Sequence, residues 1–137
     1  MIKLMKSTFY NEEETKKKLC EFIMNSEQLS MGEKCLEFEK KFSEYQGRKY
    51  SVFFNSGSSA NFALISSLVN LGMMKNNKCG FSALTWPTNV MPSLQHKLNP
   101  VPIDVSLDHL NISSEKLIKS LKDSESESDI DFLFVTI

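Results

Sequence analysis

The residues with the clearest chemical potential form a serine- and glycine-rich turn, Asn55-Ser56-Gly57-Ser58-Ser59-Ala60-Asn61. This turn lies between a short apolar run typical of a strand and a longer apolar run typical of a helix. Glycine lets the backbone approach a ligand closely, serine supplies hydroxyl donors, and the first N–H groups of a helix are free to bind an anion. The pattern predicts a buried phosphate-binding turn.

Two nucleotide-binding loops do not fit this turn, because neither G-x-x-x-x-G-K-[ST] nor G-x-G-x-x-G occurs in it. No lysine or arginine lies within it, so an anion would be held mainly by backbone N–H and hydroxyl groups. The residues alone leave one alternative open, a plain helix N-cap in which serine satisfies the free N–H groups.

Composition is that of an ordinary soluble globular domain, with 41% hydrophobic and 24% charged residues. Sixteen basic and 17 acidic residues give a net charge of −1, which argues against a nucleic-acid or membrane-surface partner. The three cysteines are widely spaced and form no C-x-x-C or Cys/His cluster, so no metal site or disulfide framework is predicted. No signal peptide or transmembrane run is apparent, and we expect a cytoplasmic protein.

Periodicity predicts two N-terminal helices and then an alternation of strands and helices. Asn11 and Glu14 form a capping-box-like start for a helix through about Ser26, and a second helix stops at Gly47 with its candidate core residues at Leu36, Phe38, Phe42 and Tyr45. Strands are predicted over 50–54, 78–84, 99–105 and 132–137. Helices are predicted over 60–71, after Pro87, and from Ser113 or Ser114 to Leu121, with an exposed loop over 123–129.

This alternation is the signature of an α/β fold with a mainly parallel sheet. We expect residues 1–48 to be a helical segment that leads into an α/β domain over 49–137, which continues beyond the chain because a bare apolar strand rarely ends a domain. Ligands of such sheets bind at the carboxyl ends of strands, where both the serine-rich turn and Thr85-Trp86-Pro87-Thr88 are predicted to lie.

Several segments, in order, resemble one family. They are Leu29-Ser30-Met31-Gly32, Glu37-Phe38-Glu39, Tyr45-Gln46-Gly47, the turn at 55–61, Ala83 to Thr88 and Pro100 to Val105. Over roughly residues 28–137 the chain is similar to the N-terminal part of DegT-type sugar-nucleotide aminotransferases, which are pyridoxal-phosphate (PLP) enzymes of fold type I. The resemblance implies the aspartate-aminotransferase-like large domain, truncated, with PLP or pyridoxamine phosphate as cofactor.

Carried over by residue, the resemblance implies that Gly57 and Ser58 hold the cofactor phosphate, with Ser59 in the same shell, and that Trp86 stacks on the pyridine ring. It also implies that the Schiff-base lysine, or a histidine in its place, comes after Ile137, so no catalytic residue is assigned and the 137 residues alone should be inactive. Two loops depart from the family, because Asn76-Asn77 and Lys97-Leu98-Asn99 stand where glycines are usual.

The resemblance favours transamination of a nucleotide-linked keto-sugar, with glutamate as amino donor, by a homodimer in surface-polysaccharide biosynthesis. A sugar 3-dehydrase of the same fold is the first alternative. The sequences of the turn at 55–61 and of Trp86-Pro87-Thr88 resemble that branch of the family somewhat more than the aminotransferase branch. An inactive, anion-binding fragment is the second alternative.

Overall fold

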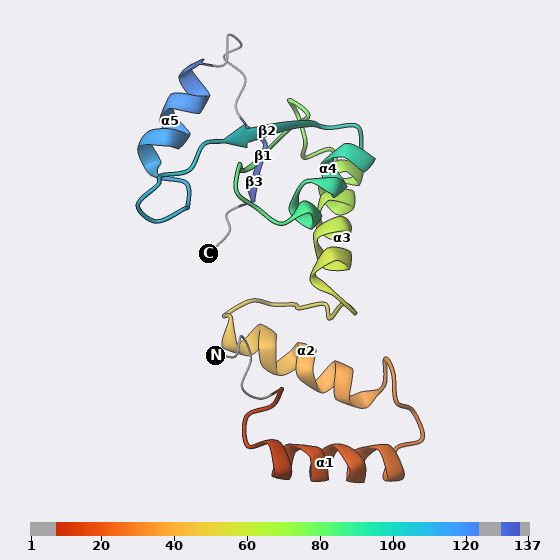
Figure 1. Ribbon diagram of the computed structural model, residues 1–137. Helices are drawn as coiled ribbons and strands as arrows, with labels where there is room; N and C mark the ends of the chain where they lie inside the picture. The colour runs from red at the N-terminus through yellow and green to blue at the C-terminus, as the bar shows by residue number, and fades with distance from the viewer. Residues whose placement is uncertain (1–7, 124–129, 135–137) are drawn as a thin grey trace. The chain divides into compact units, whose positions relative to one another are not determined.

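The computed structural model describes residues 8–123 and 130–134 of the chain. It divides between Phe53 and Phe54 into two compact units. The first unit holds helices α1 (Glu12–Asn25) and α2 (Glu33–Tyr45), and the second holds the strands and the remaining helices (Figure 1). Two predicted segments lie partly outside the described residues. They are the loop predicted over 123–129, of which 124–129 are outside, and the strand predicted over 132–137, of which 135–137 are outside.

Both predicted N-terminal helices form, and Gly47 ends α2 with a left-handed φ of 61°. The predicted capping box at Asn11 is wrong. Asn11 adopts a left-handed φ of 47° instead of the extended backbone of a capping residue, and its side-chain amide donates to the Glu14 carboxylate.

The expected core contacts of α2 are only partly formed. Leu36 and Tyr45 are 66% and 83% exposed, whereas Phe38 packs against Phe42 and Phe53 with ring centroids 5.7 and 5.1 Å apart. The prediction that Leu36 and Tyr45 are core residues is therefore wrong within this unit. The described packing of α2 involves the face of the helix that carries Phe38 and Phe42.

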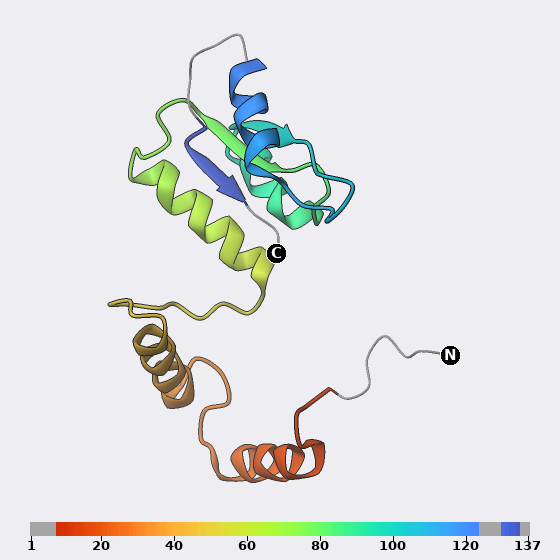
Figure 2. The same ribbon diagram turned by 90° about the vertical axis from the view of Figure 1, so that its left-hand side faces the viewer.

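The second unit is an α/β layer structure, as predicted. Its described strands, β1 (Lys78–Ser82), β2 (Asn99–Ile103) and β3 (Phe132–Phe134), pair in parallel in the order β2-β1-β3. Helices α3 (Gly57–Asn70) and α4 (Met91–Gln95) lie on one side of this sheet and α5 (Ser114–Asp123) lies on the other (Figures 1 and 2). The Ser113 hydroxyl accepts from the Lys116 N–H at 3.2 Å and caps α5, as expected.

The strand predicted over residues 50–54 does not form. A strand requires a neighbour to pair with its N–H and C=O groups, and the described sheet consists of β2, β1 and β3 without residues 50–54. Val52 and Phe53 are 70% and 50% exposed, so the segment is not buried on both faces either.

A small core joins α3 to the sheet. Ile65, Cys79 and Leu98 form its buried centre, and the surrounding apolar side chains are Leu68, Val69, Met74, Phe132 and Phe134. Burial raises the pKa of the Cys79 thiol to about 11, so Cys79 stays protonated and acts as a small apolar residue. The core holds the C-terminal half of α3 and leaves its N-terminus at the carboxyl end of the sheet.

Both loops that depart from the family contain a residue in the left-handed region, where glycine is favoured. Asn77 has a φ of 55° and Lys97 a φ of 56°. Lys97 follows α4, and the Lys97 and Leu98 N–H groups donate to the Leu94 and Ser93 carbonyls at 3.0 and 2.9 Å. Gly72 closes α3 with the same pair of bonds, so Lys97 occupies a position suited to glycine.

Replacing Lys97 by glycine is expected to stabilise the second unit by about 1 kcal/mol, because the left-handed strain of a Cβ-bearing residue is removed. Urea unfolding followed by circular dichroism measures the change. Lys119→Gly is the control with the opposite expected effect. Lys119 lies inside α5, where glycine should lower the free energy of unfolding by about 1 kcal/mol. A Lys97→Gly variant that is less stable than the parent would contradict the prediction.

Candidate phosphate-binding site

The serine-rich turn forms the N-terminus of α3. Ser56 is the N-cap, and its hydroxyl accepts from the Ser59 N–H at 3.2 Å. The N-cap alternative thus holds for Ser56, which was not among the predicted phosphate ligands. The N–H groups of Gly57 and Ser58, first in the helix, have no acceptor within the described part of the chain. These two donors are the ones an anion could use.

Gly57 leaves open space at the helix end. Among the residues that the structure describes, a Cβ built at this position would have no heavy atom within 4 Å, and the φ of Gly57 lies outside the left-handed region. Neither backbone conformation nor packing against these residues therefore requires glycine. The absent side chain leaves the first N–H groups open to an approaching ligand.

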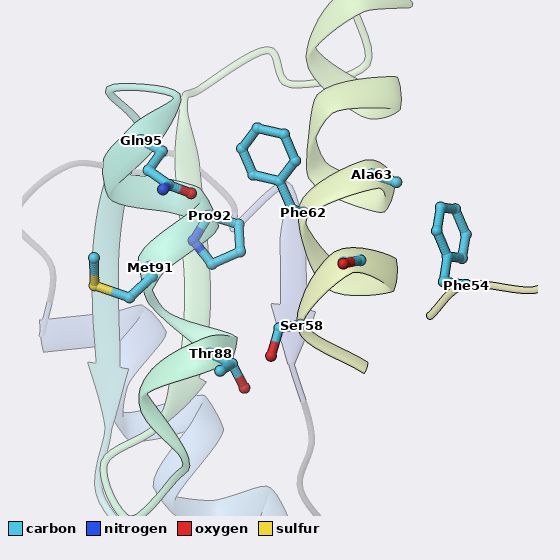
Figure 3. Close-up of a pocket in the computed structure, with 9 residues that line it drawn as sticks. Phe54, Ser58, Phe62, Ala63, Thr88, Met91, Pro92 and Gln95 are labelled. Atoms are coloured by element: carbon cyan, nitrogen blue, oxygen red, sulfur yellow. The ribbon is translucent and has the colours of Figure 1, made fainter. Parts of the chain in front are cut away.

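A cavity of about 560 Å³ adjoins this helix end. In Figure 3 Ser58 and Phe62 project from α3 toward Thr88 and Pro92, and the Ser58 and Thr88 hydroxyl groups face one another. Phe54, Ser59, Ala63, Met91 and Gln95 complete the lining. The volume falls in the usual range for small-molecule sites, and two hydroxyl groups at one end of a mostly apolar cavity suit a ligand with a polar head and a flat body.

The structure brings together three of the four predicted cofactor residues. Gly57, Ser58 and Ser59 share the first turn of α3. The Ser59 N–H donates to the Ser56 hydroxyl, and the Ser59 hydroxyl accepts from it at 3.1 Å, so that only the hydroxyl proton of Ser59 remains for a ligand. Trp86 directly precedes the short 3₁₀ helix η1 (Pro87–Asn89), is 72% exposed and is absent from the cavity lining. Its stacking role stays a prediction.

A hydrogen-bonded group that the sequence did not reveal ties α3 to η1. The Asn61 side-chain amide donates to the Asn89 Oδ1 at 2.8 Å and to the Thr88 carbonyl at 3.4 Å. The Asn89 amide in turn donates to the Thr85 hydroxyl at 2.7 Å. The sequence signal was limited to two asparagines, Asn61 at the end of the serine-rich turn and Asn89 directly after Thr88. Asparagine is too common in such segments to indicate a pair.

His96 and Asp104 have structural contacts. The His96 Nε2 lies 2.7 Å from the Ser66 hydroxyl, and its ring lies 5.2 Å from that of Phe62. Because the Ser66 hydroxyl donates to the Phe62 carbonyl at 2.8 Å, its single proton is used and Nε2–H of His96 donates. Lys116 forms an ion pair with Asp104 and lowers the pKa of that carboxyl.

The described ranges, 8–123 and 130–134, hold no group of three or more His, Cys, Asp or Glu side chains able to bind a metal ion. None of the helices in these ranges combines the length and apolar character needed to cross a membrane.

Comparison with known proteins decides the family. Residues 10–125 match the DegT/DnrJ/EryC1/StrS aminotransferase family. The chain belongs to this family. The resemblance inferred from the ordered motifs is confirmed, and the match includes the α3 turn, the η1 segment and both N-terminal helices.

Two curated relatives are bacterial 3-dehydratases. The chain is 37% identical over 98 residues to GDP-4-keto-6-deoxy-D-mannose 3-dehydratase of Yersinia pseudotuberculosis, covering 69% of this chain and 25% of the relative. It is 30% identical over 110 residues to the enzyme of the same name from Escherichia coli O55:H7, covering 78% and 28%. The chain therefore spans about a quarter of the length of these relatives.

Solved structures give the same fold. The E. coli GDP-4-keto-6-deoxy-D-mannose-3-dehydratase with bound hydrated PLP has a TM-score of 0.72 and 30% identity, with 91% of this chain and 31% of the other covered. The Helicobacter pylori aminotransferase PseC, of pseudaminic acid biosynthesis, has a TM-score of 0.63 and 28% identity, with 75% and 27% covered. The predicted fold, part of the PLP fold type I architecture, is confirmed.

Proposed function

We propose that this chain is the cofactor-phosphate-binding part of a PLP-dependent 3-dehydratase that acts on a nucleotide-linked 4-keto-6-deoxy sugar. The observation that carries the cofactor assignment is the open N-terminus of α3, with its two available N–H groups beside the Ser58 hydroxyl. The choice of reaction rests on the curated relatives named above, which are called 3-dehydratases. Transamination, the leading expectation from sequence, is supported only by family membership and by the likeness to PseC.

The residues present fit the phosphate of the cofactor. Its negative charge is favoured at the positive end of the α3 macrodipole, where the N–H groups of Gly57 and Ser58 and the Ser58 hydroxyl donate hydrogen bonds. Ser59 adds a hydroxyl, and Trp86 offers an apolar surface for the ring. When bound, the cofactor supplies an electron sink for reactions at the substrate carbon. This chain's residues would hold and orient it.

The wider assignment includes substrates and assembly. A structure of the 3-dehydratase with bound GDP-perosamine is similar to this chain at 29% identity and a TM-score of 0.73. It supports a nucleotide sugar as the substrate class of this chain. A second structure of the 3-dehydratase, with a trapped PLP-glutamate geminal diamine, supports glutamate as the amino donor. A homodimer as the working form rests on the resemblance to the family alone. The 137 residues alone are expected to bind cofactor without turnover, because the relatives' remaining three quarters have no counterpart in them.

Two chimeras test the reaction. This chain replaces the matching N-terminal part of the Yersinia 3-dehydratase in one and of PseC in the other, and mass spectrometry distinguishes 3-deoxy from amino-sugar products. We expect 3-deoxy product from the chimera built on the Yersinia 3-dehydratase and no product from the chimera built on PseC. Activity in the PseC frame alone would favour transamination, and two folded chimeras that bind no PLP would refute both reactions.

Gly57→Ala is expected to weaken binding of pyridoxamine 5′-phosphate by about tenfold, because the new Cβ occupies the space through which the phosphate reaches the N–H groups. Folding should not suffer, since nothing lies within 4 Å of that Cβ. Isothermal titration calorimetry measures the affinity, and thermal unfolding provides the control. Gly72→Ala cannot serve as a matched control, because Gly72 has a left-handed φ of 65° that alanine adopts only with strain, so this variant would lose stability.

A further inference from the structure

Asn61 joins the two motifs on which cofactor binding would depend. We propose that Asn61 is a positioning residue, which fixes the Trp86 segment relative to the phosphate-binding turn so that one cofactor is held at both ends. The inference rests on the proposed function and deepens it, because it assigns a role to a residue that contacts neither phosphate nor ring.

The position of Asn61 on α3 suits this role. It lies three residues after Ser58, on the same side of the helix, and is half-buried. Its side-chain amide supplies two donors, one to the Asn89 Oδ1 at 2.8 Å and the other to the Thr88 carbonyl at 3.4 Å. The helix that carries the phosphate donors is thus bonded to η1 by one side chain.

Asn89 extends the connection to both sides of Trp86. Its side-chain amide donates to the Thr85 hydroxyl at 2.7 Å, and its backbone N–H donates to the Trp86 carbonyl at 3.0 Å. The Trp86 side chain is 72% exposed, so packing within the described residues does not fix the indole. Hydrogen bonds from Asn89, itself bonded to Asn61, hold the peptide that carries the indole.

The value of such a connection is geometric. A cofactor gripped by its phosphate and stacked on its ring needs both contacts in register, and a misplacement of about 1 Å is enough to impair an active site. A side chain that served only the stability of the fold would lower the unfolding temperature when removed, without separating phosphate binding from ring stacking. The two roles therefore predict different results.

Trp86 is the only tryptophan of the chain and reports on stacking directly. The probe is pyridoxamine 5′-phosphate, whose amine cannot condense with surface lysines, and inorganic phosphate is titrated in parallel. Asn61→Ala should reduce the quenching of Trp86 fluorescence at saturating probe by about half or more, while phosphate affinity changes less than about twofold. Asn70→Ala, at the other end of the same helix, is the matched control and should leave both unchanged.

Thr85→Val removes the acceptor of the Asn89 amide and keeps the side chain's shape, so it tests the same link if Asn61→Ala does not fold. The deciding variant is Asn61→Ala, or Thr85→Val if Asn61→Ala does not fold. Reduced quenching in the deciding variant supports the proposal, and full quenching overturns it. If the parent chain binds the probe without quenching Trp86, the positioning role is refuted and the phosphate site stands. If the parent binds neither probe nor phosphate, the proposed function fails as well.

Discussion

Ile65→Ala is expected to lower the free energy of unfolding of the second unit by about 3 kcal/mol. Ile65 has no exposed surface and lies at the centre of the cluster that joins α3 to the sheet, against Cys79 and Leu98. Truncation removes three carbons from a close-packed site and leaves a cavity that this small core cannot readily fill. Because few side chains of this unit are fully buried, one cavity removes a large share of its stability.

Urea unfolding monitored by circular dichroism measures this loss. Leu64→Ala is the matched control, since Leu64 precedes Ile65 on the same helix and is 43% exposed. It should cost about 1 kcal/mol, because a large part of its surface, unlike that of Ile65, is already in contact with water. Equal losses for the two variants would show that the cluster around Ile65 is not the core of the unit.

Asp131→Ala is expected to cost about 2 kcal/mol, because one carboxylate satisfies several backbone donors. Its two oxygens accept from the N–H groups of Lys75, Asn76 and Lys78 at 3.1, 2.8 and 3.2 Å. Its own N–H donates to the Lys78 carbonyl at 3.0 Å. Asp131 thereby fastens the loop that precedes β1 to the start of β3, and sets the register of that parallel pair.

Hydrogen exchange separates this role from a general effect of charge. In Asp131→Ala the N–H groups of Lys75, Asn76 and Lys78 should exchange faster than in the parent, together with the loss of stability seen in urea. Asp104→Ala removes another carboxylate, exposed and paired with Lys116, and should change neither measurement appreciably. Unchanged protection of the three N–H groups in Asp131→Ala would contradict the assigned contacts.

Local pattern was sufficient for most elements of this chain. The apolar run after the serine-rich turn became α3, with Ser56 as its cap, and the segments around Cys79, Val101 and Leu133 became parallel strands. These features depend on residues a few positions apart, whose helical or strand preference is visible in the sequence. The ordered motifs also gave the family, which the match over residues 10–125 confirms.

The tertiary structure decided how those elements meet. The run at residues 50–54 has strand-like residues but pairs with none of the described strands. The bond between Asn61 and Asn89 spans 28 positions, and those from Asp131 to Lys75 and Asn76 span 56 and 55. Such pairs depend on strand order and register, which bring distant residues together and leave no periodic trace in the sequence. The serine-rich turn and the helix that it begins were thus readable from their own residues, whereas the hydrogen bonds from Asn61 to the η1 segment were not.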